Sequence, residues 1–186
     1  MEQEILKATE VLKEGGVILY PTDTVWGLGC DPTNEEAVQK ILDIKQRDAG
    51  KGLIVLVHSE ALLNRYVKEI PDVCFDLIDY AESPLTIIYP RGQYLAPKVM
   101  APDGSVAIRL TKDEFCSKLM SKTKFGLVST SANVAGEKEG RTLSEISEAV
   151  KSQVDYIVNV KEKTTKINPS QIIKIGLNNE VEIIRK

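Results

Sequence analysis

Segments with the periodicity of a helix alternate with short apolar segments along almost the whole chain of 186 residues. Residues 3–14 repeat apolar side chains at the spacing of one helix face, whereas residues 53–57 (LIVLV) form an uninterrupted apolar run. Such a run is typical of a strand that is covered on both faces, as when helices pack on both sides of a sheet. The alternation therefore favours an α/β fold over an all-helical or all-β fold.

The remaining predicted elements follow one another without a linker that would divide the chain. We expect further helices over residues 31–45, 59–70, 73–80, 115–120 and 143–150. We expect strands over residues 17–20, 85–89, 106–110, 125–129, 156–158, 171–175 and 182–184. Because the last strands are closely spaced, the sheet is expected to be mixed rather than purely parallel. The sequence thus predicts a single α/β domain that spans residues 1–186.

Composition and charge exclude several classes of protein. The net charge of −3 at pH 7 provides no global attraction to nucleic acid or anionic lipid, although a local basic concavity is compatible with it. The three cysteines show no CxxC spacing, so we expect buried, reduced thiols rather than a disulfide framework or a zinc site. The acidic N-terminus is unlike a signal peptide, and no apolar run approaches the roughly 20 residues that a membrane span requires. We therefore expect a cytoplasmic protein without membrane contact.

Polar groups gather in residues 20–29 (YPTDTVWGLG), directly after a predicted buried strand. Pro21 has no N–H to donate to a central strand, so the chain is expected to leave the sheet here. It then presents the hydroxyls of Thr22 and Thr24 and the carboxylate of Asp23. Binding residues often lie where strands end and loops begin. The alternative is an ordinary turn in which Asp23 bonds to the nearby backbone.

Two further segments concentrate charge or hydrogen-bonding groups. Lys45, Arg47 and Lys51 lie at the end of a predicted helix and in the loop after it. Ammonium and guanidinium groups together suit a polyphosphate, but cations at a helix C-terminus also complement the helix dipole in any protein. Residues 127–133 (LVSTSAN) end a predicted strand in hydroxyls and an amide, which can donate to phosphate or carboxylate oxygens.

Arg109 lies inside an otherwise apolar predicted strand and must find a partner there, because burying an unpaired charge is costly. That partner is either a ligand carboxylate or phosphate, or a structural Asp or Glu. The only histidine, His58, is interpreted as part of local structure. The sequence has no GxSxG, GxxxxGK[ST] or GxGxxG motif, so it supports neither a serine-hydrolase triad nor a Walker or Rossmann nucleotide site.

Five segments, taken in this order, resemble the YrdC-like L-threonylcarbamoyladenylate synthases in their short, catalytic-domain-only form. They are residues 20–28 (YPTDTVWGL), 45–47 (KQR), 84–86 (PLT), 106–109 (VAIR) and 129–133 (STSAN). The most specific element is a Lys-x-Arg and Ser-x-Asn tetrad, here Lys45, Arg47, Ser131 and Asn133. The resemblance extends over nearly the whole chain.

The resemblance implies a twisted open mixed sheet with flanking helices around a basic concave cleft. It also implies a nucleotidyltransferase that makes threonylcarbamoyl-AMP and pyrophosphate from L-threonine, bicarbonate and ATP. Mg²⁺ is expected to arrive with ATP, without a dedicated metal site. Separate transferase proteins would then use the product to make threonylcarbamoyladenosine at position 37 of tRNA.

The same resemblance assigns roles to particular residues. The tetrad residues are the catalytic candidates. Substrate-binding candidates are Thr22, Thr24, Thr86, Ser105, Arg109 and Ser129. The chain departs from the family pattern at Asp48 and Gly52, where proline is common, and at Ala135, where serine is common. It also has Gln171 where the family has threonine.

Two other functions remain as alternatives. An RNA-binding or ribosome-maturation factor would use the same cleft without catalysis, but the net charge and the lack of interleaved aromatic residues disfavour it. We expect at most weak, salt-sensitive RNA binding. A module that carbamoyl-adenylates another acceptor would resemble one domain of the hydrogenase-maturation proteins, whose other domains have no counterpart in this sequence.

Overall fold

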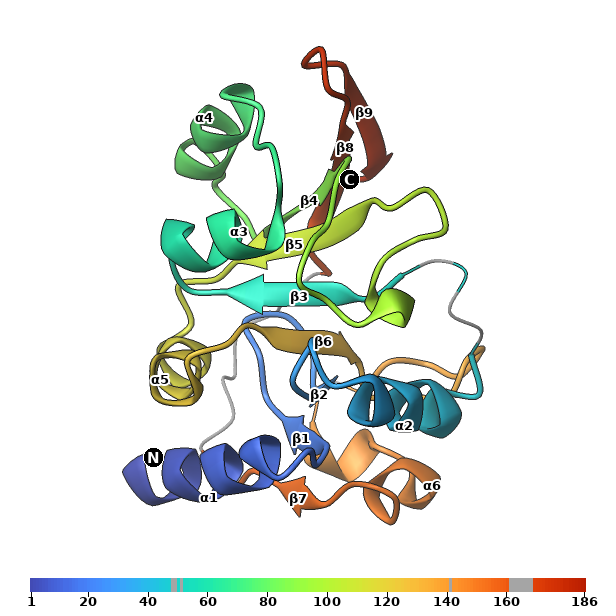
Figure 1. The fold of residues 1–186 in the computed structure, drawn as a ribbon. Helices are drawn as coiled ribbons and strands as arrows, with labels where there is room; N and C mark the ends of the chain where they lie inside the picture. The colour runs from blue at the N-terminus through green and yellow to red at the C-terminus, as the bar shows by residue number, and fades with distance from the viewer. Residues whose placement is uncertain (48–49, 51, 141, 161–168) are drawn as a thin grey trace.

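The computed structural model describes residues 1–47, 50, 52–140, 142–160 and 169–186. The strands in this part of the chain join one sheet in the order β7-β1-β2-β6-β3-β5-β4-β8-β9 (Figure 1). Their bounds are β1 Ile18–Tyr20, β2 Gly27–Gly29, β3 Ile54–Val57, β4 Leu85–Tyr89, β5 Val106–Leu110, β6 Leu127–Ser131, β7 Tyr156–Ile157, β8 Gln171–Ile175 and β9 Val181–Arg185.

The sheet is mixed, as the sequence predicts. The pairs β1–β7, β3–β5 and β4–β8 are parallel. The pairs β1–β2, β2–β6, β3–β6, β4–β5 and β8–β9 are antiparallel. Together with the helices on both sides, this arrangement confirms the expected α/β fold class.

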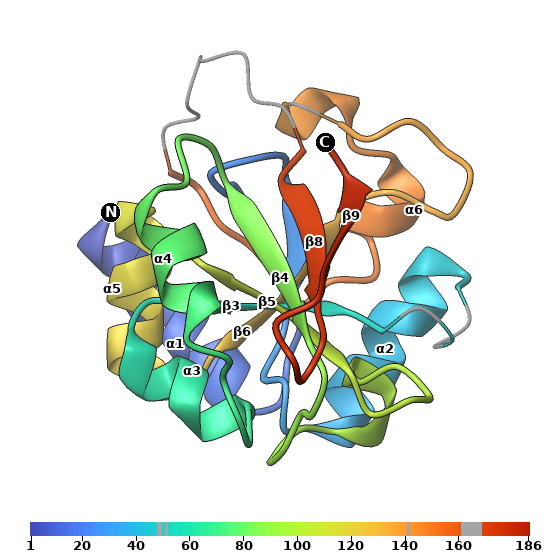
Figure 2. The same cartoon turned by 90° about the horizontal axis from the view of Figure 1, so that it is seen from above.

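Helices cover both sides of the sheet. Figure 2 shows α1, α3, α4 and α5 on one side, and α2 and α6 on the other. Their bounds are α1 Glu2–Lys13, α2 Glu35–Lys45, α3 Glu60–Tyr66, α4 Val73–Asp79, α5 Glu114–Thr123 and α6 Glu148–Lys151, and among the described residues 3₁₀ helices span Pro97–Val99 and Leu143–Glu145. In β3, Val55 and Val57 pack into one core and Leu56 into another. The apolar run 53–57 is therefore a strand buried on both faces, as predicted.

Side-chain caps set the starts of three helices. Asn34 accepts from the amide of Ala37 at 3.0 Å and caps α2. The helix therefore begins at Glu35, inside the range 31–45 that the sequence predicts for it. Ser59 accepts from the amide of Leu62 and begins α3, as predicted. Such caps satisfy amides that have no partner inside the helix. At the other end of α2, Gln46 adopts a left-handed conformation with φ of 49°, which turns the chain sharply before Arg47.

The structure corrects three details of the sequence prediction. The chain does leave the sheet at Pro21, but it returns at once as the unpredicted strand β2. A Cβ on Gly29 would lie 2.6 Å from the Tyr20 ring and 3.0 Å from the Val128 carbonyl oxygen. Close packing thus demands glycine, a poor strand former, and this conceals the strand. In addition, β6 lies two residues later than the predicted 125–129, and the region 143–150 contains a 3₁₀ turn and a short helix.

Several expectations concern the chain as a whole. Cys30, Cys74 and Cys116 are buried and unpaired, as predicted. Among the described residues, no helix is long and apolar enough to cross a membrane. Lys51 and Asp48, which the sequence analysis singled out, lie outside the described residues.

Candidate functional site

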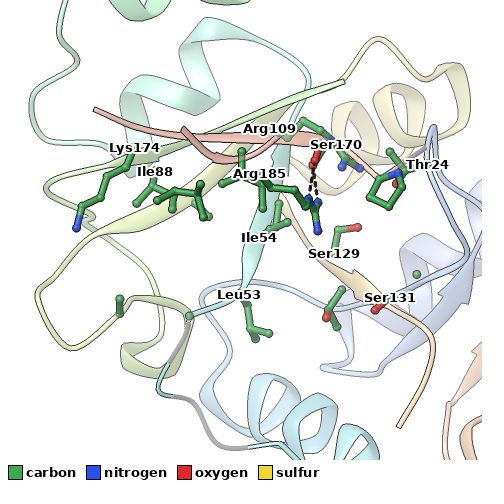
Figure 3. Close-up of a pocket in the computed structure, with 18 of the residues that line it drawn as sticks. Thr24, Leu53, Ile54, Ile88, Arg109, Ser129, Ser131, Ser170, Lys174 and Arg185 are labelled. Atoms are coloured by element: carbon green, nitrogen blue, oxygen red, sulfur yellow. Dashed lines mark hydrogen bonds between the residues drawn. The ribbon is translucent and has the colours of Figure 1, made fainter. Parts of the chain in front are cut away.

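A cavity of about 700 Å³ lies against one face of the sheet (Figure 3). Its floor is formed by apolar side chains on one face of the sheet, since a strand places alternate side chains on opposite faces. The residues that face the cavity are Ile54 of β3, Ala107 of β5, Ile88 of β4, Ile172 of β8 and Ile184 of β9. Their neighbours in sequence, such as Ile87 and Ile108, pack into the core with residues of α3 and α4. The rim comes from residues 24–27, the end of β6, residues 101–105 and residues 169–170.

Six of the ten predicted site residues line this cavity. They are Thr24, Arg47, Ser105, Arg109, Ser129 and Ser131. The other four, Thr22, Lys45, Thr86 and Asn133, do not line it. Three of these four hold residues that do face the cavity, so the structure brings most of the predicted set together as one unit.

Two hydroxyl pairs join the wall to the residues behind it. The hydroxyl oxygens of Thr22 and Thr24 are 3.0 Å apart, and Thr22 also accepts from the amide of Thr24 at 2.9 Å. Thr22 donates in turn to the carbonyl of Val25 at 2.8 Å. On the opposite wall, the hydroxyls of Thr86 and Ser170 are 2.8 Å apart. These bonds explain why short hydroxyl side chains occupy buried positions at the ends of β1 and in β4.

Lys45 supports the end of β6 from behind the wall. Its Nζ donates to the backbone carbonyls of Ser131 at 2.6 Å and Asn133 at 2.9 Å, and the side chain is only 3 % exposed. Burial, and after it the nearby charge of Arg47, lowers the pKa of Lys45 to about 8. Glu139 opposes this shift. In the structure, the charge of Lys45 therefore stabilises the turn that presents Ser131.

The rest of the tetrad shapes the loops beside the cavity. Arg47 faces the cavity just beyond α2, and its Nη2 donates to the carbonyl of Gly52 at 3.3 Å. The side-chain amide of Asn133 donates to the carbonyls of Val134 at 3.1 Å and Glu137 at 2.8 Å. Asn133 thus fixes the loop after β6, and its predicted contact with phosphate stays a prediction.

Arg109 forms an ion pair with a carboxylate of the chain, that of Asp23. Its Nη2 donates to Asp23 Oδ1 at 2.9 Å, and the Arg109 side chain is 4 % exposed. Its Nε is buried and has no hydrogen-bond partner among the described residues. Because an unsatisfied buried donor is costly, a ligand acceptor that reached this N–H would relieve that cost.

Charged residues that were not predicted from the sequence come to the cavity from β8 and β9. Arg185 donates through Nε to the Ser170 carbonyl at 2.9 Å and through Nη2 to the Ser170 hydroxyl at 3.3 Å (Figure 3). Lys174 pairs with Asp103 at 3.2 Å, and Asp103 also accepts from the Ser105 hydroxyl at 2.6 Å. The bonds from Ser105, followed by Lys174, lower the pKa of Asp103 to about 2. The alternation of Ile172 and Lys174 was the available signal that both share a face.

The charges around the cavity are mixed, with a small excess of positive charge. The described lining residues include four cations and three anions. The cations are Arg47, Arg109, Lys174 and Arg185, and the anions are Asp103, Glu139 and Glu182. Two of the cations have carboxylate partners, Asp23 for Arg109 and Asp103 for Lys174. No carboxylate in the described part of the chain lies within ion-pair distance of Arg47 or Arg185. Positive charge is therefore concentrated at these two guanidinium groups.

Comparison with known proteins shows the family to which the chain belongs. The family model of Sua5, YciO and YrdC proteins, described as "Telomere recombination", matches residues 10–186. The chain belongs to this family. It is 37% identical over 169 residues to a protein of Idiomarina loihiensis named threonylcarbamoyl-AMP synthase, covering 89% of this chain and 90% of that protein. A protein of Pseudomonas aeruginosa with the same name is 40% identical over 152 residues, covering 81% and 82%.

A solved member of the family shares the fold. The structure of P. abyssi Sua5 complexed with L-threonine superposes with a TM-score of 0.83 at 28% identity. The match covers 94% of this chain but 52% of the Sua5 chain, so this chain spans about half the length of that relative. The resemblance found from the five sequence segments is thereby confirmed at the level of family and fold.

Replacing Lys45 by Met should change how stability depends on pH. The folded state holds the pKa of Lys45 at about 8 instead of its ordinary 10.5, so between these values the unfolded chain binds more protons than the folded one. Raising the pH through this window therefore favours the folded wild type over Lys45→Met, by on the order of 3 kcal/mol in unfolding free energy. Urea denaturation at several pH values measures this difference. Lys122→Met, at an exposed lysine, is the control, and a difference that stays flat with pH contradicts the prediction.

Proposed function

We propose that this protein is an L-threonylcarbamoyladenylate synthase, which makes threonylcarbamoyl-AMP and pyrophosphate from L-threonine, bicarbonate and ATP. Two relatives that match most of its length carry the name of this enzyme. The observation that carries the proposal is the division of charge within one cavity. Arg109 is neutralised by Asp23 and keeps one buried donor free, whereas Arg47 and Arg185 lack carboxylate partners among the described residues.

This division suits two substrates of different charge. An amino acid is a zwitterion, and its single carboxylate fits one guanidinium whose charge is already balanced. A triphosphate carries several negative charges and needs cations that are not already neutralised. We therefore assign the carboxylate of L-threonine to Arg109 and the phosphates of ATP to Arg47. The hydroxyls of Thr24 and Ser129 lie on the same wall and supply further contacts to the amino acid.

The proposed chemistry joins these two sites. The amine of L-threonine and bicarbonate form a carbamate with loss of water. A carbamate oxygen then attacks the α-phosphorus of ATP, the bond to the β-phosphate oxygen breaks, and pyrophosphate leaves. Both reactants are anionic, so the step depends on positioned positive charge and hydrogen-bond donors. Arg47 and Ser131 face the cavity for this role, while Lys45 holds the backbone that presents Ser131 and Asn133 holds the loop after β6.

The remaining assignments follow from the family chemistry. Ser105 lines the cavity, and its hydroxyl donates to Asp103. Thr22 acts by holding Thr24, and Thr86 acts by holding Ser170. In the described part of the chain, no three metal-ligating side chains come together, so we propose Mg²⁺ only as the companion of the ATP phosphates. We further propose that the product passes to separate tRNA threonylcarbamoyl transferase proteins, and that any RNA binding is weak and salt-sensitive.

Substrate dependence tests the proposed reaction directly. Pyrophosphate release from ATP should require both L-threonine and bicarbonate, because the attacking carbamate needs both. A coupled pyrophosphate assay with each component omitted in turn measures this requirement. L-serine in place of L-threonine reports selectivity. Equal release without threonine would identify a simple ATPase and contradict the proposal, whereas tight RNA binding at high salt without any release would favour the RNA-factor alternative.

Arg47→Ala separates a phosphate-binding cation from one that only complements the dipole of α2. On the dipole alternative, the loss is about 0.3–1 kcal/mol of stability with near-normal turnover. On the proposed function, losing a positioned electrostatic contact costs about 3–4 kcal/mol in the transition state, or on the order of a hundredfold in rate or more. The measurements are turnover and thermal melting.

Lys122→Ala is the matched control for Arg47→Ala. Lys122 lies in the last turn of α5, where it complements a helix dipole but does not line the cavity. We expect Lys122→Ala to keep its turnover. The assignment of Arg47 is wrong if both variants melt normally and turn over at similar rates.

A further inference from the structure

Asp23 stands behind the cavity wall and is fixed by two bonds. Its Oδ1 accepts from Arg109 Nη2 at 2.9 Å, and its Oδ2 accepts from the Thr111 hydroxyl at 2.9 Å. Its neighbours Thr24 and Val25 line the cavity, but Asp23 is not part of the lining. Asp23 therefore meets the cavity through Arg109, the lining residue to which its carboxylate is bonded.

Thr111 connects this carboxylate to the start of α5. The Thr111 hydroxyl accepts from the amide of Asp113 at 3.1 Å, which leaves its single proton for Asp23. The side chain of Asp113 accepts from the amide of Cys116 at 2.9 Å and caps α5. Asp23 is thus held by β5 and by a helix start, although it belongs to the loop between β1 and β2.

The pairing sets which donor of Arg109 remains for a ligand. Asp23 occupies Nη2, while Nε is buried and without a partner among the described residues. The carboxylate also balances the charge of Arg109, so Arg109 offers directed donors without adding net positive charge of its own.

We propose that Asp23 is a positioning residue that makes the Arg109 side of the cavity selective for an amino-acid carboxylate over phosphate. It does so by orienting Arg109 with Nε free and by neutralising its charge. This inference rests on the proposed function, in which Arg109 binds the carboxylate of L-threonine. Without the charge of Asp23, Arg109 becomes an uncompensated cation like Arg47 and attracts the phosphates of ATP.

Asp23→Asn tests this role, because it keeps the shape of the side chain but removes its charge. Calorimetric titration with L-threonine should show a dissociation constant raised about tenfold, the equivalent of one lost hydrogen bond to a charged group. In addition, ATP should compete with L-threonine in the variant but not in the wild type. A purely structural defect would not create this competition.

Asp155→Asn is the matched control. Asp155 forms an ion pair with Lys40 at 2.7 Å and accepts from the amide of Val17, away from the cavity. We expect it to leave binding of L-threonine unchanged. If Asp23→Asn does not fold, Thr111→Val, which keeps the charge but removes one bond to Asp23, should shift L-threonine binding in the same direction by a smaller factor.

The outcomes separate this inference from the proposed function. L-threonine binding by the wild type without pyrophosphate release would overturn the synthase activity, while the binding comparison would still test Asp23. Wild-type L-threonine affinity in Asp23→Asn overturns the role of Asp23, and so does an equal loss of L-threonine and ATP binding in a folded variant. A wild type that binds no L-threonine overturns both.

Discussion

Two buried cations tie the parts of this site together. Arg109 and Lys45 are 4 % and 3 % exposed, and a charge at such positions requires partners inside the protein. Arg109 takes Asp23 from the β1–β2 loop, and Lys45 takes the carbonyls of Ser131 and Asn133 at the end of β6. Through these bonds, β5 and α2 fix two loops that lie far from them in sequence. Removing one partner of such a buried charge typically costs about 3–5 kcal/mol.

The hydroxyls of Thr24 and Ser131 are presented by segments that the buried cations already hold. On the other side, Arg185 reaches from β9 to Ser170, whose hydroxyl meets that of Thr86 in β4 (Figure 3). The result is a cavity with an apolar floor and directed polar groups around its rim, which is the usual composition of a small-molecule site.

The fold class and most of the site could be predicted from local sequence. Periodicity identified the helices, and the apolar run 53–57 identified the central strand β3. The short strand β2 could not be predicted, because Gly27 and Gly29 are selected by close contacts with Tyr20, Thr22 and β6 that only the fold reveals. Likewise, Lys174 reaches the cavity because β8 pairs with β4, and Arg185 reaches it because β9 pairs with β8. The paired residues of β4 and β8 are more than 80 positions apart in the chain, so local sequence does not reveal this pairing.

The direction of a side chain was harder to predict than its location. The motif placed Lys45 in the site, but its Nζ turns to backbone carbonyls rather than to the cavity. For Arg109, the sequence left a ligand and a structural carboxylate as equal alternatives. The structure provides Asp23 and still leaves Nε unpaired among the described residues, so one arginine has both a structural partner and a free donor.

The division of charge within the cavity is tested most directly by a crystal structure with L-threonine and a non-hydrolysable ATP analogue bound together. The account predicts that the threonine carboxylate accepts a hydrogen bond from Arg109 Nε, and that the triphosphate lies beside Arg47. A triphosphate bound to Arg109, with the threonine carboxylate elsewhere, would contradict it.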